Sequence, residues 1–448
     1  INNKVVPIYT RNCVNLLKYF CGIATHRKKN LDIDRYQVRV KSMRVLIALR
    51  NAKNVFISFL SFILLLTFFM FMRSDSNSRH TYIISATYYK SAINLPSNTM
   101  MILFTSQKHL IGSQSLKCLT RFGDKKFISN MTIKYAVPEI VECKWTPYLA
   151  QCETIENTSI LEIAVADDEG IFVQIPFRKP TKILHDVVTC FSPLFMNERW
   201  QLLILALEVY RYYGASMQNF YITSIISEVY KLLKVYEKRG WVTIDVWPKM
   251  DFEHDLSYDP NEEMEWRGQV VAQTDCLLKY KVSAKFVIFG DLDDILFPRL
   301  GKSYLSEFEK LLVQNKFAAA FIYNRYESYL TSARQPATYS ILSALQSAKI
   351  STRWVDGKWV AVSSRVMTTA IHYPWIVNNG YSIVTVPKHT NIMAHFRNWK
   401  FVEDMRSARS RRNTRSDVDW LEKNETINLS TLIDVEDMNA IEKILWKR

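Results

Sequence analysis

Three carboxylates, Asp291, Asp293 and Asp294, occur within four residues directly after the apolar run Lys285-Phe-Val-Ile-Phe-Gly. Like charges this close repel one another unless a cation lies between them. A hard divalent ion such as Mn²⁺ or Mg²⁺ takes oxygen ligands and leaves positions open for substrate phosphates. Leu292 points back to the core in such a turn, so Asp291 and Asp293 can face one ion. Capping of the next turn is the alternative. The apolar strand before the motif favours a metal site.

Two classes of enzyme place a D-x-D motif after an apolar strand. Phosphohydrolases that use an aspartate nucleophile need a Thr after the motif and a later acidic pair, but Ile295 follows here and the next Asp is Asp356. GT-A glycosyltransferases place the motif after several strand–helix units and use it to hold Mn²⁺ against the diphosphate of a nucleotide sugar. The second class fits this sequence better. A catalytically inactive carbohydrate-binding or adhesion relative is the non-enzyme alternative, which the three intact Asp residues disfavour.

The segment before the motif alternates between strand-like and helix-like patterns. Strands and helices that alternate predict an α/β fold with a parallel or mixed Rossmann-type sheet and helices on both faces. Ligands bind such sheets beyond the carboxyl ends of the strands, which is where Asp291 lies. The predicted strands are Val187–Cys190, Phe220–Thr223, Trp241–Val246 and Lys285–Gly290, and the predicted helices are Glu198–Tyr213, Ser224–Arg239 and Glu263–Val282.

An uncharged stretch of 18 residues from Val55 to Met72 is close in length to the hydrocarbon core of a bilayer and is rich in Phe. Twelve Lys or Arg precede it within residues 1–53, against only Asp32 and Asp34, which predicts a cytoplasmic N-terminus. We therefore predict a single-pass type II membrane protein, with a buried core helix as the alternative. About +10 of the net charge of +15 lies in this tail, which argues against binding to nucleic acid.

Cysteine and sequon positions agree with a lumenal domain. Five cysteines lie beyond the predicted span, which is compatible with two disulfides and one free thiol in an oxidising compartment. The four N-x-S/T sequons also lie beyond it, at Asn130, Asn157, Asn424 and Asn428. The predicted parts are a cytoplasmic basic tail (1–53), a transmembrane signal anchor (54–72), a stem (73–104), a small β-rich lumenal subdomain (105–182), a catalytic domain (183–402) and a basic tail with a short helix (403–448).

Six stretches follow one another in a specific order: Cys190-Phe-Ser-Pro-Leu-Phe-Met-Asn-Glu-Arg-Trp, Tyr213-Gly with Phe220-Tyr-Ile after it, Gly240-Trp-Val with Trp247-Pro, Gln273-Thr-Asp-Cys, Phe289-Gly-Asp-Leu-Asp-Asp with Pro298, and His395-Phe-Arg. Together they resemble glycosyltransferase family 92. The resemblance implies a GT-A-like domain and kinship with inverting β-galactosyltransferases that act on fucose-bearing glycans. The implied reaction moves galactose from a UDP-sugar to a glycan acceptor, with inversion. The expected compartment is the Golgi, with the ER and the cell surface as the alternatives.

The resemblance also implies roles for single residues near the motif. Asp291 and Asp293 would bind Mn²⁺ or Mg²⁺ and, through it, the diphosphate of the UDP-sugar. His395 would be a third ligand or a phosphate contact, with a half-buried loop histidine as the alternative. Arg397 is a candidate for phosphate binding because a guanidinium can clamp two oxygens, although it could equally be a surface charge.

Inversion needs a general base that takes the proton of the acceptor hydroxyl. Glu327 and Asp356 are the candidates that follow the metal motif. Glu327 is favoured because it comes after the predicted strand Ala318–Tyr323, whereas Asp356 precedes a Gly as turn residues do. Glu198 and Asp275 lie in the family-like segments and would contact the nucleotide or support the site, with capping or hydrogen bonding as the alternative role.

Overall fold

The computed structural model describes most of the chain beyond the predicted membrane segment. The predicted tail (1–53) and transmembrane helix (54–72) lie outside the described residues, as does the basic stretch 404–425. In the part of the chain that is described, no helix is both long and apolar enough to cross a membrane. The described ranges are 80–107, 116–138, 143–165, 172–197, 199–252, 256–403, 426–433 and 435–446.

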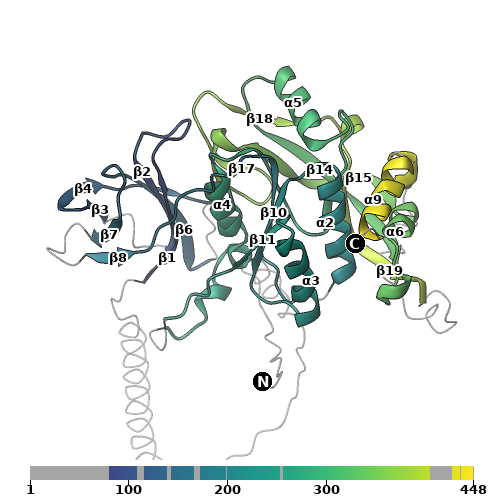
Figure 1. Cartoon of the computed structure of the whole chain (residues 1–448), viewed down its shortest axis with the longest axis horizontal. Coiled ribbons are helices and arrows are strands. Elements are labelled where there is room, and N and C mark those ends of the chain that lie inside the picture. The colour runs from purple at the N-terminus through teal and green to yellow at the C-terminus, as the bar shows by residue number, and fades with distance from the viewer. Residues whose placement is uncertain are drawn as a thin grey trace, which may run out of the picture. The chain divides into compact units, whose positions relative to one another are not determined.

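Two four-stranded antiparallel sheets form a β-sandwich at the start of the described chain (Figure 1). Its strands are β1 (Thr81–Tyr89), β2 (Thr99–Gln107), β3 (Leu116–Phe122), β4 (Lys125–Asn130), β5 (Thr132–Tyr135), β6 (Trp145–Glu153), β7 (Ile160–Val165) and β8 (Val173–Ile175). One sheet has the order β1-β2-β6-β5 and the other β4-β3-β7-β8. Met100, Ile102 and Phe104 share one face of β2 and pack in the core between the sheets. A disulfide between Cys118 and Cys152 joins β3 to β6.

The range predicted as a stem, residues 73–104, contains β1 and most of β2. Its Ser, Thr and Asn content suggested a linker, but Thr is β-branched and suits a strand. The second face of β2 is buried as well, because Met101 and Leu103 pack in one cluster with Val271 and Leu278 of the following domain. A strand that is buried on both faces belongs to the folded subdomain, so the structure corrects this boundary.

A ten-stranded mixed sheet organises the rest of the described chain. Its strands are β9 (His185–Phe191), β10 (Met217–Ile222), β11 (Val242–Val246), β12 (Ala284–Gly290), β13 (Asp294–Leu296), β14 (Ala318–Ser332), β15 (Lys349–Val362), β18 (Ser382–Thr385), β19 (Met393–Phe401) and β20 (Thr426–Asn428). The order is β11-β10-β9-β12-β15-β14-β19-β13, with β18 beside β14 and β20 beside β15. The pairs β11–β10, β10–β9 and β9–β12 are all parallel, which confirms the four predicted parallel strands.

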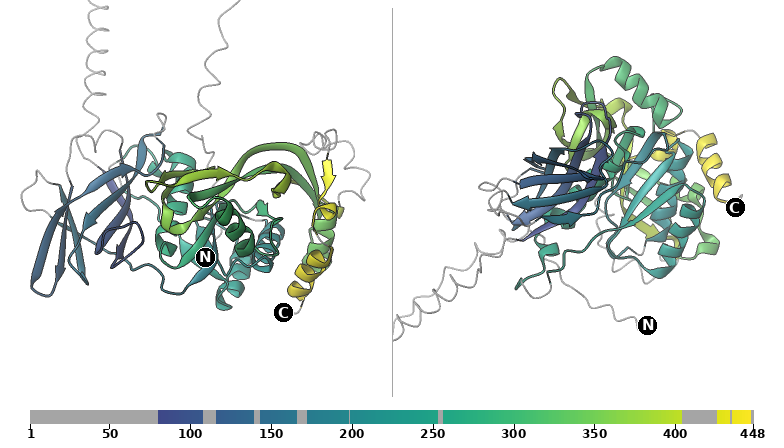
Figure 2. Two further views of the ribbon diagram at one scale, coloured as in Figure 1. Left: turned by 90° about the horizontal axis from the view of Figure 1, so that it is seen from above. Right: turned by 60° about the vertical axis from the view of Figure 1, so that its left-hand side comes forward.

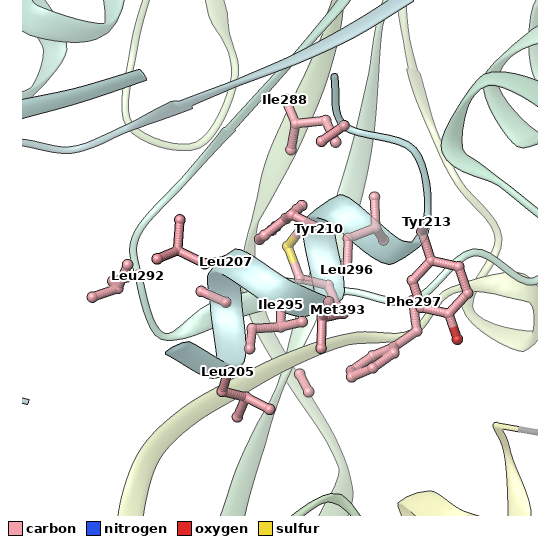
Figure 3. Packing of buried hydrophobic residues seen from close by; sticks show 14 of the residues in the cluster. Leu205, Leu207, Tyr210, Tyr213, Ile288, Leu292, Ile295, Leu296, Phe297 and Met393 are labelled. Carbon is pink, nitrogen blue, oxygen red and sulfur yellow. The ribbon is translucent and has the colours of Figure 1, made fainter. Parts of the chain in front are cut away.

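Helices cover both faces of the parallel strands, as predicted. They are α2 (Trp200–Tyr212), α3 (Ser227–Lys238), α4 (Gln269–Tyr280) and α5 (Tyr304–Gln314). The core that contains α2, α3 and α5 includes Val187 of β9, whereas the core that contains α4 includes its neighbour Val188. Figure 3 shows Leu207 and Tyr210 of α2 packed among the apolar side chains that follow β12. A disulfide between Cys190 and Cys276 ties β9 to α4.

The predicted helix Glu263–Val282 is shorter in the structure. Two 3₁₀ turns, η2 (Pro260–Glu262) and η3 (Glu265–Gly268), precede α4. Trp266, Arg267 and Gly268 have φ values of 43°, 55° and 79°, which no right-handed helix accommodates. Apolar spacing continues through these residues, but their backbone turns the other way, so the helix begins only at Gln269.

The long strands β14 and β15 arch across the domain (Figure 2). Their antiparallel register shifts between Tyr323 and Arg325 and again between Tyr326 and Ser328. Such bulges bend a strand and increase its twist without ending it. The strand that was expected to end at Tyr323 therefore continues to Ser332, and Glu327 lies within it rather than beyond its end.

The C-terminal segment, predicted as a tail with a short helix (403–448), supplies part of the core. Helix α9 (Val435–Trp446) places Met438 and Ile441 in the main hydrophobic cluster, and both are fully buried. The Tyr212 hydroxyl of α2 donates a hydrogen bond of 2.5 Å to Asp437. The other elements are α6 (Ile341–Ser347), β16 (Val366–Thr369), β17 (Pro374–Val377), η4 (Pro336–Thr338), η5 (Ser363–Arg365), η6 (Lys388–Thr390) and η8 (Leu429–Thr431).

The β-sandwich is linked to α4 by a largely buried ion pair. Arg178 follows β8, and its guanidinium nitrogens lie 2.6 and 3.1 Å from the two carboxylate oxygens of Asp275. The Tyr221 hydroxyl donates a third hydrogen bond, of 2.6 Å, to the same carboxylate. Asp275 is only 4% exposed, so its charge depends on these partners rather than on water.

We expect Arg178→Met to lower the free energy of unfolding by about 3 kcal/mol, because it leaves the Asp275 carboxylate buried without its cation. Lys234→Met is the matched control, since Lys234 pairs with Glu237 at a more exposed site and its loss should change stability little. Denaturant unfolding monitored by tryptophan fluorescence measures both variants. Equal losses in the two variants would contradict a special role for Arg178.

The same ion pair predicts a pH dependence. Burial opposes ionisation of Asp275, but Arg178 outweighs burial and lowers the pKa of this carboxyl below its ordinary value. The stability that the pair contributes is therefore complete above the unfolded pKa of about 3.9 and is lost as the pH falls through the lower, folded value. Arg178→Met should flatten this part of the stability profile.

Candidate active site

The acidic motif forms the connection between two strands of the large sheet. β12 ends at Gly290, Asp291 and Asp293 lie in the turn, and Asp294 begins β13. β13 pairs antiparallel with β19, which sets Asp294 opposite His395. The Phe396 amide of β19 donates a hydrogen bond of 2.8 Å to the Asp293 carbonyl. The motif is thus held at the carboxyl end of the fourth parallel strand, as predicted, and against a strand 100 residues later.

Asp293, Asp294 and His395 form a group of potential metal ligands. One donor atom from each lies within 4.8 Å of the other two. Asp293 Oδ2 and His395 Nε2 are 3.4 Å apart. Two carboxylates and an imidazole are a donor set that suits Mn²⁺ and related divalent ions, so these residues fit the implied metal. The group contains two of the three ligands predicted from the sequence, with Asp294 in place of Asp291.

Asp291 is held instead by three protein groups. Its Oδ2 lies 2.9 Å from the Lys358 Nζ, and its Oδ1 accepts hydrogen bonds from the Ser192 hydroxyl and, at 2.8 Å, from the Gln269 amide. Gln273, one turn further along α4, donates to Ser192 in turn. Helix α4 and the end of β9 therefore fix the orientation of the first carboxylate of the motif.

The electrostatic balance differs between the acidic residues. Burial opposes the ionisation of Asp291, but Lys358 outweighs it and lowers the pKa of this carboxyl. Burial raises the pKa of Asp294 to about 6, against the opposing effect of Lys358, and the charges of Asp291 and Asp293 raise it further. The pKa values of Asp291 and Asp294 are therefore shifted in opposite directions. Such perturbed carboxylates are common at functional sites.

Glu327 is brought to the motif by the pairing of β14 with β19. It lies opposite His395 in a parallel register that shifts just after it. Its Oε1 is 3.2 Å from the His395 Nδ1, and this hydrogen bond lowers the pKa of Glu327. Burial lowers the pKa of His395, but its bonds to Asp293 and Glu327 outweigh burial and raise it to about 9. Glu327, His395 and Asp293 thus form one chain of contacts.

Asp356 lies at the bulge of β15, not in a turn as its neighbour Gly357 suggested. A side chain at Gly357 would begin 1.7 Å from the Tyr323 carbonyl, so glycine is required there by the close approach of β14. Asp356 itself is exposed. Burial lowers the pKa of His372, whose Nδ1 lies 2.8 Å from the Gly357 carbonyl oxygen, and the charge of Asp356 acts in the opposite direction. The two residues proposed as a general base are therefore on adjacent strands.

The three predicted nucleotide contacts are placed differently. Arg397 is exposed on β19, two residues from His395, and its charge helps to lower the pKa of Glu327. Asp275 accepts hydrogen bonds from Arg178 and Tyr221, which is the hydrogen-bonding role that was given as the alternative for it. Glu198 lies outside the described residues.

Sequence reasoning missed two cations at the site. Lys358 is fully buried on β15, and Arg325 of β14 lies 3.4 Å from an oxygen of Asp294. Lys358 stands inside the apolar run Gly357-Lys-Trp-Val-Ala-Val, and a lysine there could have signalled a buried acidic partner. The partner could not be identified, because β15 meets β12 only in the folded sheet.

We expect Lys358→Met to reduce the free energy of unfolding by about 3–5 kcal/mol, because it removes the cation from two buried carboxylates. Its Nζ lies 2.9 Å from Asp291 and 3.9 Å from Asp294 and has no well-aligned hydrogen bond in the described structure, so its contribution is electrostatic. The double variant Lys358→Met with Asp291→Asn should recover part of the loss. Additive losses in thermal and denaturant unfolding would argue against this pairing.

This is an α/β domain of the class in which ligands bind at the sheet edge formed by the carboxyl ends of the parallel strands. The acidic groups and the histidine lie at that edge. The sequence model of glycosyltransferase family 92 matches residues 185–431. Two Caenorhabditis elegans proteins of this family are 35% and 31% identical to this chain, over 75% and 73% of it. The chain belongs to glycosyltransferase family 92.

The aligned region covers 66% and 64% of the two relatives' own lengths, so the match spans just under two-thirds of those proteins. A third C. elegans member is 33% identical over 65% of this chain and 58% of its own length. Among solved structures, TarS of S. aureus aligns with 48% of this chain and with 60% of the TarS chain. The sequence identity is 10% and the TM-score is 0.26, which is too weak a similarity to support a conclusion.

Proposed function

We propose that this protein is a metal-dependent glycosyltransferase that moves a sugar from a UDP-sugar to a glycan acceptor. Membership of glycosyltransferase family 92 supports the reaction class. The observation that carries the metal and donor assignment is the group formed by Asp293, Asp294 and His395 at the end of the parallel strands. On the basis of the family resemblance we also propose galactose as the sugar, a fucose-bearing glycan as the acceptor and inversion at the anomeric carbon.

Asp293, Asp294 and His395 would hold a divalent cation, with Asp291 fixed beside them by Lys358. Such an ion, when bound, neutralises charge on the diphosphate of the departing nucleotide. Arg397 is exposed next to this group and is our candidate for binding a phosphate oxygen. Gln269 and Ser192 would keep Asp291 in one orientation and so limit reorganisation when the donor binds.

The two candidate bases have different surroundings. Glu327 is hydrogen-bonded to His395, so we propose that it orients this ring, in the way that carboxylates orient metal-binding histidines. Asp356 is exposed and has the freer carboxylate to accept a proton from an acceptor hydroxyl. Glu327 remains the alternative base, and the two assignments predict different kinetic effects.

We also propose a type II topology with the catalytic domain in the Golgi lumen. The uncharged stretch 54–72 and the basic residues before it motivate the anchor. Two disulfides, Cys118–Cys152 and Cys190–Cys276, support an oxidising compartment. Protease protection of the lumenal part in sealed microsomes would test the topology, and digestion of that part without detergent would refute it.

The decisive experiment is a donor screen with the purified full chain. A panel of UDP-sugars is incubated with fucose-bearing and fucose-free glycans, in Mn²⁺ and in EDTA. We expect turnover with one UDP-sugar, UDP-galactose first, that requires Mn²⁺. If no UDP-sugar is turned over with Mn²⁺, while a glycan still binds, the protein would be an inactive carbohydrate-binding relative instead.

A further inference from the structure

A cavity of about 1030 Å³ lies where the β-sandwich meets the large sheet. Its walls come from residues 88–93, 179–182, 281–282, 284–285 and 362–364, together with Asn157. Residues 281–285 lead into β12, whose other end carries the acidic motif. A strand of seven residues spans roughly 20 Å, so this cavity is separate from the proposed donor site.

The charge of the cavity is strongly one-sided. None of the described residues that line it is Asp or Glu, whereas five are lysines: Lys90, Lys179, Lys182, Lys281 and Lys285. Two of these have carboxylate partners, Lys90 with Glu156 and Lys285 with Glu309. The other three form no ion pair within the described chain. A concave wall lined by one sign of charge concentrates ligands of the opposite sign.

Lys281 distinguishes this wall from a surface patch of lysines. Its side chain is only 2% exposed, and its Nζ donates hydrogen bonds to the carbonyls of Ser363, at 3.3 Å, and Val366, at 2.7 Å. An ammonium has three donors, so one is left over, and neutral carbonyls do not balance its charge. Burial lowers the pKa of Lys281 to about 7, which reflects the missing counter-ion. A bound anion would supply it.

The cavity also offers apolar surface beside the lysines. Ile93 is 70% exposed and Val282 is 39% exposed, and both line it. A bare inorganic ion would contact only the ammonium groups, and the apolar surface would stay exposed to water. A ligand with a non-ionic body would cover it and gain from its burial.

We propose that this cavity binds a small soluble ligand that carries two or more phosphate or sulfate groups on a sugar-sized body. Lys179, Lys182 and Lys281 contact the oxyanions, and Ile93 and Val282 contact the body. Because the β-sandwich and the large sheet both contribute walls, the bound ligand stabilises their contact. This site lies outside the donor site, and its existence does not depend on the glycosyltransferase assignment.

Direct binding to the purified full chain tests the proposal. Calorimetric titrations use fructose 1,6-bisphosphate as the phosphate source and a trisulfated heparin disaccharide as the sulfate source. Both are carried out in EDTA, so that a metal-dependent donor site does not contribute. We expect at least one probe to bind with a submillimolar Kd that weakens with added salt.

The variants separate a specific site from general attraction. Lys179→Gln with Lys182→Gln removes two exposed cavity charges and should weaken binding about tenfold or more. Lys125→Gln with Lys126→Gln removes two charges that are also exposed, on β4 and outside the cavity, and should leave the Kd unchanged. Lys281→Met should also abolish tight binding, and its melting temperature is measured alongside because the substitution also removes two hydrogen bonds to carbonyls.

Three results would overturn the proposal. The first is that neither probe binds below millimolar concentration. The second is an equal loss of affinity in the two double variants, which would show attraction to net charge alone. The third is unchanged binding in the Lys179→Gln, Lys182→Gln variant, whose two substitutions are at exposed positions.

Discussion

Asp293→Asn is expected to lower the rate of sugar transfer by about 10³-fold, because losing a ligand removes several kcal/mol of charge stabilisation from the departing diphosphate. Asp293 is the predicted ligand that the structure places beside His395 Nε2, at 3.4 Å, and its side chain is 24% exposed and thus open to a substrate. The measurement is kcat/KM with saturating Mn²⁺, together with Mn²⁺ binding by electron paramagnetic resonance. Both should fall while the melting temperature stays within a few degrees of the parent.

Asp124→Asn is the matched control for this variant. Asp124 is exposed in the turn between β3 and β4 and undergoes the same chemical change far from the sheet edge. Its activity and Mn²⁺ binding should equal those of the parent. If Asp293→Asn retained Mn²⁺-dependent nucleotide binding, the metal assignment would be wrong, whatever happened to the rate.

Glu327→Gln is expected to weaken Mn²⁺ binding about 10- to 100-fold, because the carboxylate that orients His395 and favours its metal-binding form is lost. Activity at low Mn²⁺ should fall accordingly and should recover largely at high Mn²⁺. The measurement is the dependence of kcat on Mn²⁺ concentration. The pairing of Glu327 Oε1 with His395 Nδ1 at 3.2 Å is the contact on which this expectation rests.

Asp356→Asn is the informative comparison, because a general base contributes on the order of 10²- to 10⁴-fold to the rate without binding the metal. We expect it to lower kcat at every Mn²⁺ concentration and to leave the Mn²⁺ dependence unchanged. The opposite pattern, in which Glu327→Gln loses kcat that Mn²⁺ does not restore and Asp356→Asn is active, would make Glu327 the base.

Much of the fold could be read from local patterns. The strands around Val187, Phe220, Val242 and Phe286 were visible because apolar runs alternate with helical periodicity, and each run ends at a glycine or a polar loop. These patterns depend only on neighbours in sequence. The start of α4 was misplaced because the positive φ at Trp266 and Arg267 leaves the apolar spacing intact.

The longer strands and the terminal segments were harder to predict. β14 passes through Arg325 and Glu327, which are charged and resemble a loop in sequence, but bulges and pairing on both sides carry the strand through them. β2 was assigned to a stem because of its polar neighbours, although both of its faces are buried. In each case tertiary contacts outweigh local propensity.

The sequence by itself determined that an acidic turn, Asp291 to Asp294, follows the fourth parallel strand, because strand order and an apolar run are local properties. Only the tertiary structure decided which residues meet that turn. Lys358, Glu327 and His395 come from β15, β14 and β19, and their approach depends on sheet pairings that span up to about 100 residues. The physical reason is that register and bulges are fixed by packing across the sheet, so a carboxylate's partner cannot be inferred from its own neighbours.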